Sequence, residues 1–108
     1  MTMADVVSAL AERTGIPFAL DGWQTNPDAE AWGSVIRRGE AGAIWGDDEQ
    51  QEQALRGYVS VFARRECGIQ DTVQNAIRTL DLSWRYETED YEPDTRLWHY
   101  TWSIACWR

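Results

Sequence analysis

The sequence predicts an α+β fold in which two helices pack on a mostly antiparallel sheet of four to six strands, giving two layers. Two segments repeat apolar residues with the period of an amphipathic helix, and several others alternate apolar and polar residues with the period of a strand. Runs of strands separate the two helical segments, which is typical of this class. With 108 residues, positions 1–108 are expected to form one domain around a single modest core.

The first predicted helix spans residues 2–14. Its apolar residues recur at helical spacing and would share one face, and they are Met3, Val6, Val7, Leu10 and Ala11. Thr2 is suited to cap the N-terminus, with Asp5 in the position of the capping-box acid. Gly15 can adopt the left-handed conformation that ends a helix, and Pro17 prevents the helix from continuing.

Short strands are expected after this helix. Residues 16–23 are apolar and run into an Asp-Gly turn signal, so they predict a strand. Residues 25–30 contain Asn-Pro-Asp and predict a loop, and residues 32–37 predict a second strand. After a turn at 39–42, residues 43–45 predict a brief further strand.

The middle of the chain supplies the centre of the sheet and the second helix. Residues 57–65 predict a central strand, because both faces of that strand are largely apolar. Residues 68–80 predict the second helix, which should lie across one face of the sheet. Residues 82–86 alternate and predict a strand. Residues 46–53 and 87–94 are rich in acids and predict exposed loops, the second of which would connect a terminal hairpin.

Residues 97–108 form the predicted strand with the clearest alternation. One face would carry large side chains suited to the core, namely Trp98, Tyr100, Trp102, Ile104 and Cys106. The other face would be mostly small or polar, with His99, Thr101, Ser103, Ala105 and Trp107. We therefore expect this strand to pack on the core through one face.

The charge of the chain limits the classes of partner. Eighteen acidic residues face ten basic ones, for a net charge of −8 at pH 7, and every basic residue is arginine. Holding a nucleic-acid backbone needs clustered cations, so this balance argues against a protein that wraps DNA or RNA. No stretch approaches the roughly 20 apolar residues of a membrane span, and no export signal is recognisable. We interpret Cys67 and Cys106 as buried, reduced thiols of an intracellular protein, with a disulfide between them as the alternative.

No motif in the chain predicts catalysis. His99 is the only histidine, and we interpret it as a structural residue on the polar face of its strand. The acidic runs 47–49 and 87–90 lack the ligand spacing of a calcium loop, and zinc ligands at suitable spacing are missing. The chain also has no phosphate-binding glycine loop and no nucleophile motif. The sequence therefore predicts no catalytic residue, no metal and no cofactor.

Short strings of residues along nearly the whole chain carry a resemblance to a known family. They are Thr14-Gly15-Ile16-Pro17-Phe18-Ala19 followed by Trp23, then Trp45-Gly46-Asp47, Tyr58-Val59-Ser60-Val61-Phe62, Tyr86-Glu87-Thr88-Glu89, and the strand that begins at Leu97. In this order they resemble the tail completion, or tail terminator, proteins of long-tailed bacteriophages. The chain departs from the typical pattern in its seven tryptophans and its lack of lysine.

The resemblance implies a structural virion protein with no enzymatic activity. Such proteins assemble into a ring, usually a hexamer, that caps the head-proximal end of the tail tube and ends its polymerisation. The implied partners are further copies of the chain, the tail tube protein and the head–tail connector, with assembly in the bacterial cytoplasm and final residence in the neck of the virion. DNA would pass through the lumen without specific binding, because an acidic ring repels phosphates.

We expect the assembly surface in the two acidic segments, 46–53 and 87–94, and on the polar face of the closing strand. The residues of this hypothesis are Asp47, Asp48, Glu49, Glu52, Glu87, Glu89, Asp90, Tyr91, Glu92, Asp94 and His99. The alternative is a small acidic inhibitor or adaptor that mimics DNA or binds a basic host protein. An enzyme ranks third, and it would need a pocket that joins His99 to two acids.

Overall fold

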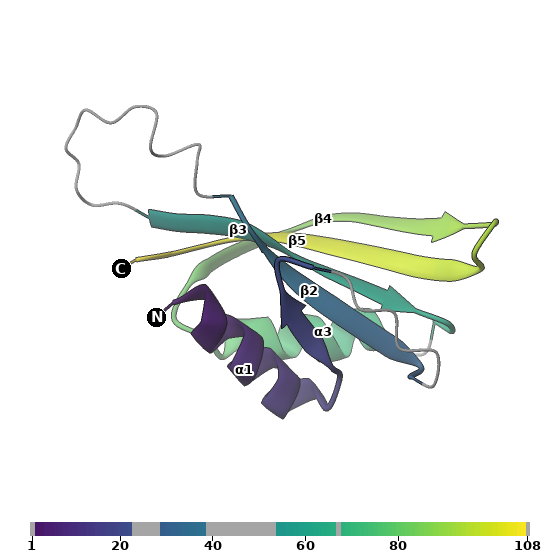
Figure 1. Ribbon diagram of the computed structural model, residues 1–108, viewed down its shortest axis with the longest axis horizontal. Helices are drawn as coiled ribbons and strands as arrows, with labels where there is room; N and C mark the ends of the chain where they lie inside the picture. The colour runs from purple at the N-terminus through teal and green to yellow at the C-terminus, as the bar shows by residue number, and fades with distance from the viewer. Residues whose placement is uncertain (1, 23–28, 39–53, 67, 108) are drawn as a thin grey trace.

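The computed structural model describes residues 2–22, 29–38, 54–66 and 68–107. In chain order the elements are α1 (Met3–Thr14), β1 (Phe18–Leu20), β2 (Ala31–Arg37), β3 (Ala54–Ala63), α3 (Ile69–Arg78), β4 (Ser83–Glu92) and β5 (Leu97–Trp107). The predicted α+β fold is confirmed, with a mostly antiparallel sheet of five strands and two helices in the described residues (Figure 1). Neither of these helices is long and apolar enough to cross a membrane.

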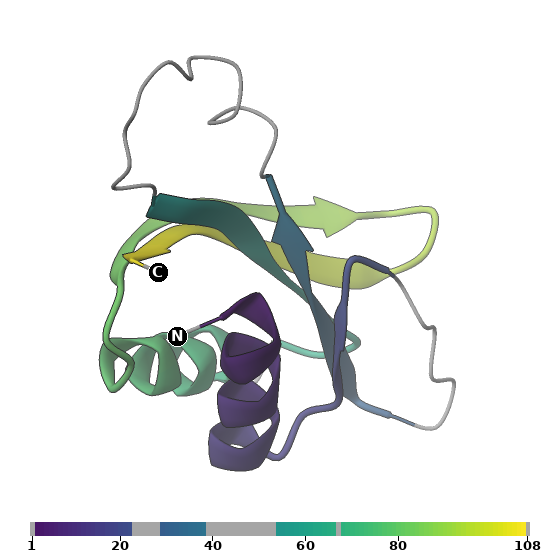
Figure 2. The same ribbon diagram turned by 60° about the vertical axis from the view of Figure 1, so that its left-hand side comes forward.

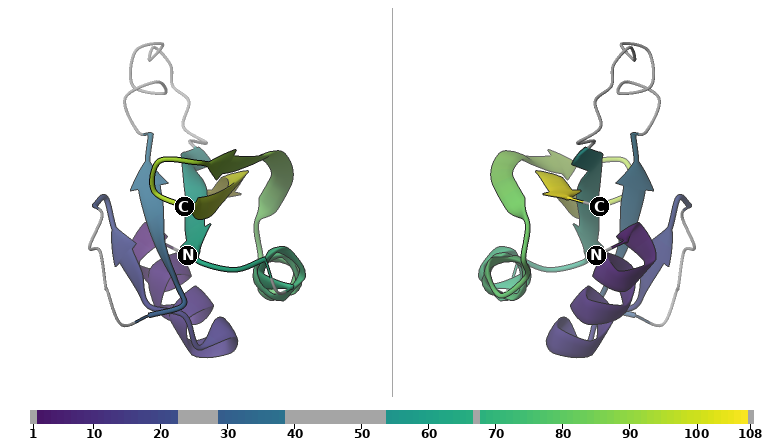
Figure 3. Two further views of the ribbon diagram at one scale, coloured as in Figure 1. Left: turned by 90° about the vertical axis from the view of Figure 1, so that its right-hand side faces the viewer. Right: turned by 90° about the vertical axis from the view of Figure 1, so that its left-hand side faces the viewer.

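The sheet has the strand order β1-β2-β3-β5-β4. Only β1 and β2 run parallel, and the other neighbouring strands are antiparallel. Strand β3 is central as predicted, with Val59 opposite Val35 on one side and Trp102 on the other. Both helices lie against the same face of the sheet, as Figure 2 and the two end-on views of Figure 3 show. We call the other face the open face, because none of the described helices covers it.

Helix α1 begins and ends as the sequence predicts. Thr2 and Asp5 form a capping box, in which the Thr2 Oγ1 accepts from the Asp5 amide at 3.1 Å and the Asp5 carboxylate accepts from the Thr2 amide at 2.9 Å. These hydrogen bonds hold the pKa of Asp5 below its usual value. Gly15 ends the helix with φ 74°, a conformation that a residue with a Cβ rarely adopts. The guanidinium of Arg13 donates to Thr79, which ties α1 to the end of α3.

The core lies between the helices and the covered face of the sheet. Val6 and Leu10 of α1 and Val73 and Ile77 of α3 are fully buried there. Strand β5 supplies the large side chains predicted for this face, and Tyr100, Trp102, Ile104 and Cys106 are buried while Trp98 is half-buried. Burial raises the pKa of the Cys106 thiol, which keeps it protonated. The alternation of the closing strand is thus confirmed.

Three predicted strand boundaries are wrong. The strand expected at 57–65 is β3, which begins earlier, at Ala54, because its pairing with β5 continues to Trp107, and which ends at Ala63. The strand expected at 16–23 is only the three residues of β1, because Pro17 cannot donate to the sheet and Asp21, at φ 55°, turns the chain away. The loop expected at 87–94 is mostly strand, because β4 continues to Glu92 in register with β5. Its acidic residues suggested a loop, yet their backbone pairs while their side chains face solvent. The expected loop at 25–28, strand at 43–45 and acidic loop at 46–53 lie outside the described residues.

Candidate assembly surface

The open face carries side chains from four strands, arranged by the strand register. Strands β2, β3 and β5 contribute, among others, Trp32, Ser34, Ile36, Tyr58, Ser60, Phe62, His99, Thr101 and Ser103. Three of them form a row of rings across β2, β3 and β5. The centroids of Trp32 and Phe62 lie 6.2 Å apart, and those of Phe62 and His99 lie 4.2 Å apart with the rings 8° from parallel. The guanidinium of Arg64 lies 5.2 Å from the Trp32 ring.

His99 is held in this row as the structural residue that the sequence predicts. Its Nε2 lies 3.4 Å from the hydroxyls of both Ser60 and Thr101, and the ring is half-buried against Phe62. This burial lowers the pKa of His99, although the carboxylates of two acids on β4 act in the opposite direction. His99 is therefore neutral near pH 7, and its ring packs on Phe62 in the open face.

The β4–β5 hairpin brings most of the predicted assembly residues together. We call residues 87–96 the acidic hairpin: it comprises the second half of β4 and the turn Pro93–Arg96. In this segment Asp90 pairs opposite His99 and Glu92 opposite Leu97 on the open face. Glu87, Glu89, Tyr91 and Asp94 complete the predicted set in this segment, and all four are exposed. The predicted residues Asp47, Asp48, Glu49 and Glu52 lie outside the described part of the chain.

The acidic hairpin is an ordered arm. The Arg96 amide donates to the Glu92 carbonyl at 2.7 Å and closes the turn, and Arg96 adopts φ 60°. Tyr91 packs on Trp98 across the two strands, with the ring centroids 5.0 Å apart, and stays 47% exposed. Figure 1 shows this arm reaching beyond the end of the helical layer. The backbone that carries these acids is therefore mostly strand, whereas the sequence predicted an exposed loop.

Glu87 differs from the other acids of the hairpin because its charge is used within the chain. It sits at an irregularity in the register between Tyr86 and Thr88. Its carboxylate accepts from the Ser103 hydroxyl at 2.7 Å and from the Arg85 Nε at 3.2 Å. These contacts hold the pKa of Glu87 below its usual value. Glu87 is thus a structural link between β4 and β5, and the charge left available to a partner comes from the acids nearer the turn.

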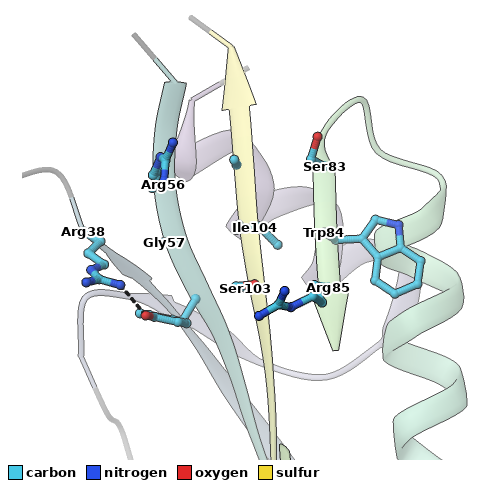
Figure 4. A pocket seen from close by; sticks show the side chains of 10 residues that line it. Arg38, Arg56, Gly57, Ser83, Trp84, Arg85, Ser103 and Ile104 are labelled. Carbon is cyan, nitrogen blue, oxygen red and sulfur yellow. Dashed lines mark hydrogen bonds between the residues drawn. The ribbon is translucent and has the colours of Figure 1, made fainter. Parts of the chain in front are cut away.

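Three arginines meet at the opposite end of the open face, around a groove of about 280 Å³. We call it the arginine groove (Figure 4): Arg38 follows β2, Arg56 lies on β3 and Arg85 on β4. Its lining includes the backbone of Gly57 and the small side chain of Ala105, together with Tyr58, Ser83 and Ser103. A Cβ at Gly57 would stand 2.4 Å from the Ile36 carbonyl oxygen, so the close pairing of β2 with β3 requires glycine there.

The cations of the arginine groove are held in place unequally. The Arg38 Nη1 donates to the Tyr58 hydroxyl at 2.5 Å, and its guanidinium lies 5.5 Å from the same ring. Arg85 pairs with Glu87. Arg56 is exposed, and within the described residues neither it nor Arg38 forms an ion pair. The groove can therefore accept an anion.

Sequence reasoning missed this groove. Arg38, Arg56 and Arg85 are far apart in the chain, and they meet only because β5 lies between β3 and β4. The one local signal is that Arg56, Tyr58 and Ser60 alternate onto the same face. Deducing the groove also requires the register of β4, which places Arg85 opposite Ser103.

The described residues hold no group of three or more His, Cys, Asp or Glu side chains placed to bind a metal ion. No family model matches the chain, and a search of curated proteins gave no significant match.

Proposed function

We propose that this chain is a structural subunit of a bacteriophage tail, and that copies of it form a ring that caps the head-proximal end of the tail tube. The observation that carries the proposal is that the sheet has a long edge strand next to a face on which no described helix packs. Strand β4 is a ten-residue edge strand, and it borders a face that no described helix covers. A small domain with a long edge strand and a sheet face that carries no described helix has surfaces that subunit contacts use.

The composition of the β4 edge supports a specific contact. Edge strands expose unpaired backbone groups, and charged side chains on them prevent indiscriminate pairing between chains. The outer half of β4 carries Glu87, Glu89, Asp90 and Glu92. Such an edge repels a second acidic edge and accepts only a surface with compensating cations, as an ordered ring requires.

The resemblance of the sequence to tail terminators provides the second line of support. It implies a compact α+β domain, and the fold of this chain is of that class. The net charge of −8 suits a ring that DNA must traverse, because a lumen of that sign repels phosphates. In this proposal the partners are further copies of the chain, the tube protein below and the connector above.

The charge layout favours assembly over the alternative of a DNA mimic. A mimic needs acids in a continuous stripe that imitates two phosphate backbones. In the described residues the acids of β4 are divided between the two faces of the hairpin, and Arg85 and Arg96 flank them along the chain. A pull-down of a nuclease or another basic protein by the purified chain would support mimicry.

The decisive experiment is deletion of the gene from the phage that encodes it, followed by electron microscopy of lysates. We expect tail tubes of uncontrolled length and filled heads without tails, with rescue by the gene supplied from a plasmid. The purified chain, alone or with purified tube protein, should form rings whose mass is a multiple of the 12.4 kDa chain. Normal, head-joined tails of normal length from the deleted phage would overturn the proposal.

A further inference from the structure

The strongest unassigned feature is the separation of opposite charges along the sheet. The arginine groove lies where β3 and β4 begin and β5 ends, and the acidic hairpin lies at the other end of the β4–β5 pair. Figure 1 shows the hairpin turn at one end of the molecule, far from the start of β3. In a chain with eight more acids than bases, a groove with three arginines is a departure from the average surface.

The groove is built to receive carboxylates. Guanidinium groups hold carboxylates through paired hydrogen bonds of fixed geometry. Arg38 donates to the Tyr58 hydroxyl and packs on the Tyr58 ring, so Tyr58 orients its guanidinium. The other N–H groups of Arg38 remain for a carboxylate. Arg56 projects from the neighbouring strand, as Figure 4 shows, and has no ion-pair partner among the described residues. The hydroxyl of Ser83 in the lining can donate to the same acids, whereas the hydroxyl of Ser103 already donates to Glu87.

The acidic hairpin of the same copy cannot reach this groove. Glu92 lies seven positions after Arg85 along the extended strand, and at 3.3 Å a position this is about 23 Å. Pairing with β5 keeps β4 extended from Ser83 to Glu92, with one register irregularity between Tyr86 and Thr88. The acidic hairpin of a second copy is not limited by this distance. It carries negative charge, which complements the arginines, on an arm only two strands wide.

We propose that the acidic hairpin of one copy docks into the arginine groove of the next copy. Asp90, Glu92 and Asp94, which follow one another toward the turn, supply the carboxylates, and Arg38 and Arg56 receive them. Because the two surfaces differ and lie at opposite ends of the sheet, the contact is head-to-tail and repeats from copy to copy. This inference rests on the proposed function, since it names the subunit contact of the proposed ring.

A lysine-free chain allows a direct test by crosslinking. Arg56→Lys keeps the charge and places the one side-chain amine of the protein in the groove. A carbodiimide then joins that amine to any carboxylate in contact, with loss of water and formation of an amide. We expect mass spectrometry to find the link to an acid at 90–94, and mixed light and 15N-labelled copies to show that the link joins two different copies.

The matched control is Arg13→Lys, an exposed site on α1 that lies outside both surfaces. It should give no link to residues 90–94. A link from the groove amine to the acids at 47–52 within the same copy would overturn the proposal, because the occupant of the groove would then be the chain's own segment. The absence of any link in assembled material would overturn it as well.

Charge reversal provides the second test. Arg56→Glu alone, and Asp90→Arg with Glu92→Arg, should each weaken self-association at least about tenfold, because each places like charges together. All three changes in one chain should restore association. Circular dichroism checks that each variant folds. We expect folding to be retained, because these side chains are exposed or half-buried and lie outside the core. Association of the wild-type protein should also weaken in about 1 M NaCl, because the Debye screening length there is only about 3 Å.

The two proposals fail in different ways. If rings form and the deleted phage makes uncontrolled tubes, but charge reversal has no effect, the ring function stands and this contact is wrong. If the crosslink forms and charge reversal acts as expected, but the deleted phage makes normal tails, the contact stands and the tail function is wrong.

Discussion

Substituting Trp102 by phenylalanine should destabilise the protein by about 2 kcal/mol. Trp102 is fully buried, and its Nε1 donates to the Gln74 Oε1 at 3.2 Å. Phenylalanine removes this hydrogen bond, worth about 1 kcal/mol. It also removes roughly 40 Å² of buried aromatic surface, worth about 1 kcal/mol at 25 cal/mol per Å². Truncation to alanine should cost more, about 3–5 kcal/mol, because a cavity remains beneath Tyr86 and Tyr100.

Urea unfolding followed by far-ultraviolet circular dichroism measures these changes, because the other tryptophans would complicate fluorescence. The melting temperature of the Trp102→Phe variant should fall by roughly 8 °C, at about 4 °C per kcal/mol for a domain of this size. The matched control is Trp98→Phe, since Trp98 is half-buried on the hairpin and should cost less than about 1 kcal/mol. If the two variants lost the same stability, or if Trp102→Phe cost less than about 0.5 kcal/mol, the reasoning from burial would be refuted.

Three further predictions concern the backbone and the open face. Gly57→Ala should destabilise by about 1–3 kcal/mol in urea titrations, because its Cβ would meet the Ile36 carbonyl oxygen at 2.4 Å, and an unchanged midpoint would contradict that close approach. Thr2→Ala should cost about 1 kcal/mol through loss of the helix cap, read from thermal melts, whereas a serine there should retain most of the stability. The pKa of His99 is lowered by burial, so the unfolded chain takes up the proton first and stability should fall as pH drops below 6.5. His99→Phe keeps a ring stacked on Phe62 and should reduce that loss between pH 7 and pH 5, and equal pH dependence of the two proteins would count against the burial of His99.

The hydrophobic pattern predicted most of the elements because each is decided by local physics. The capping box at Thr2, the left-handed Gly15 and the alternation of β5 are all properties of short segments, and the structure confirms each of them. The second half of β4 could not be predicted in this way. Its residues pair through the backbone beyond the helical layer, so no side chain there carries the burial signal that marks a strand.

The sequence by itself determined the class of fold, the face of β5 that enters the core and the excess of negative charge, because composition and periodicity depend only on the order of residues. Only the tertiary structure decided where the charges lie. The arginine groove exists because β5 inserts between β3 and β4 and the register sets Arg85 opposite Ser103, close to Arg56 on the far side. The acids of the hairpin became an ordered arm for the same reason, since pairing with β5 is a contact between strands and not a property of either strand alone.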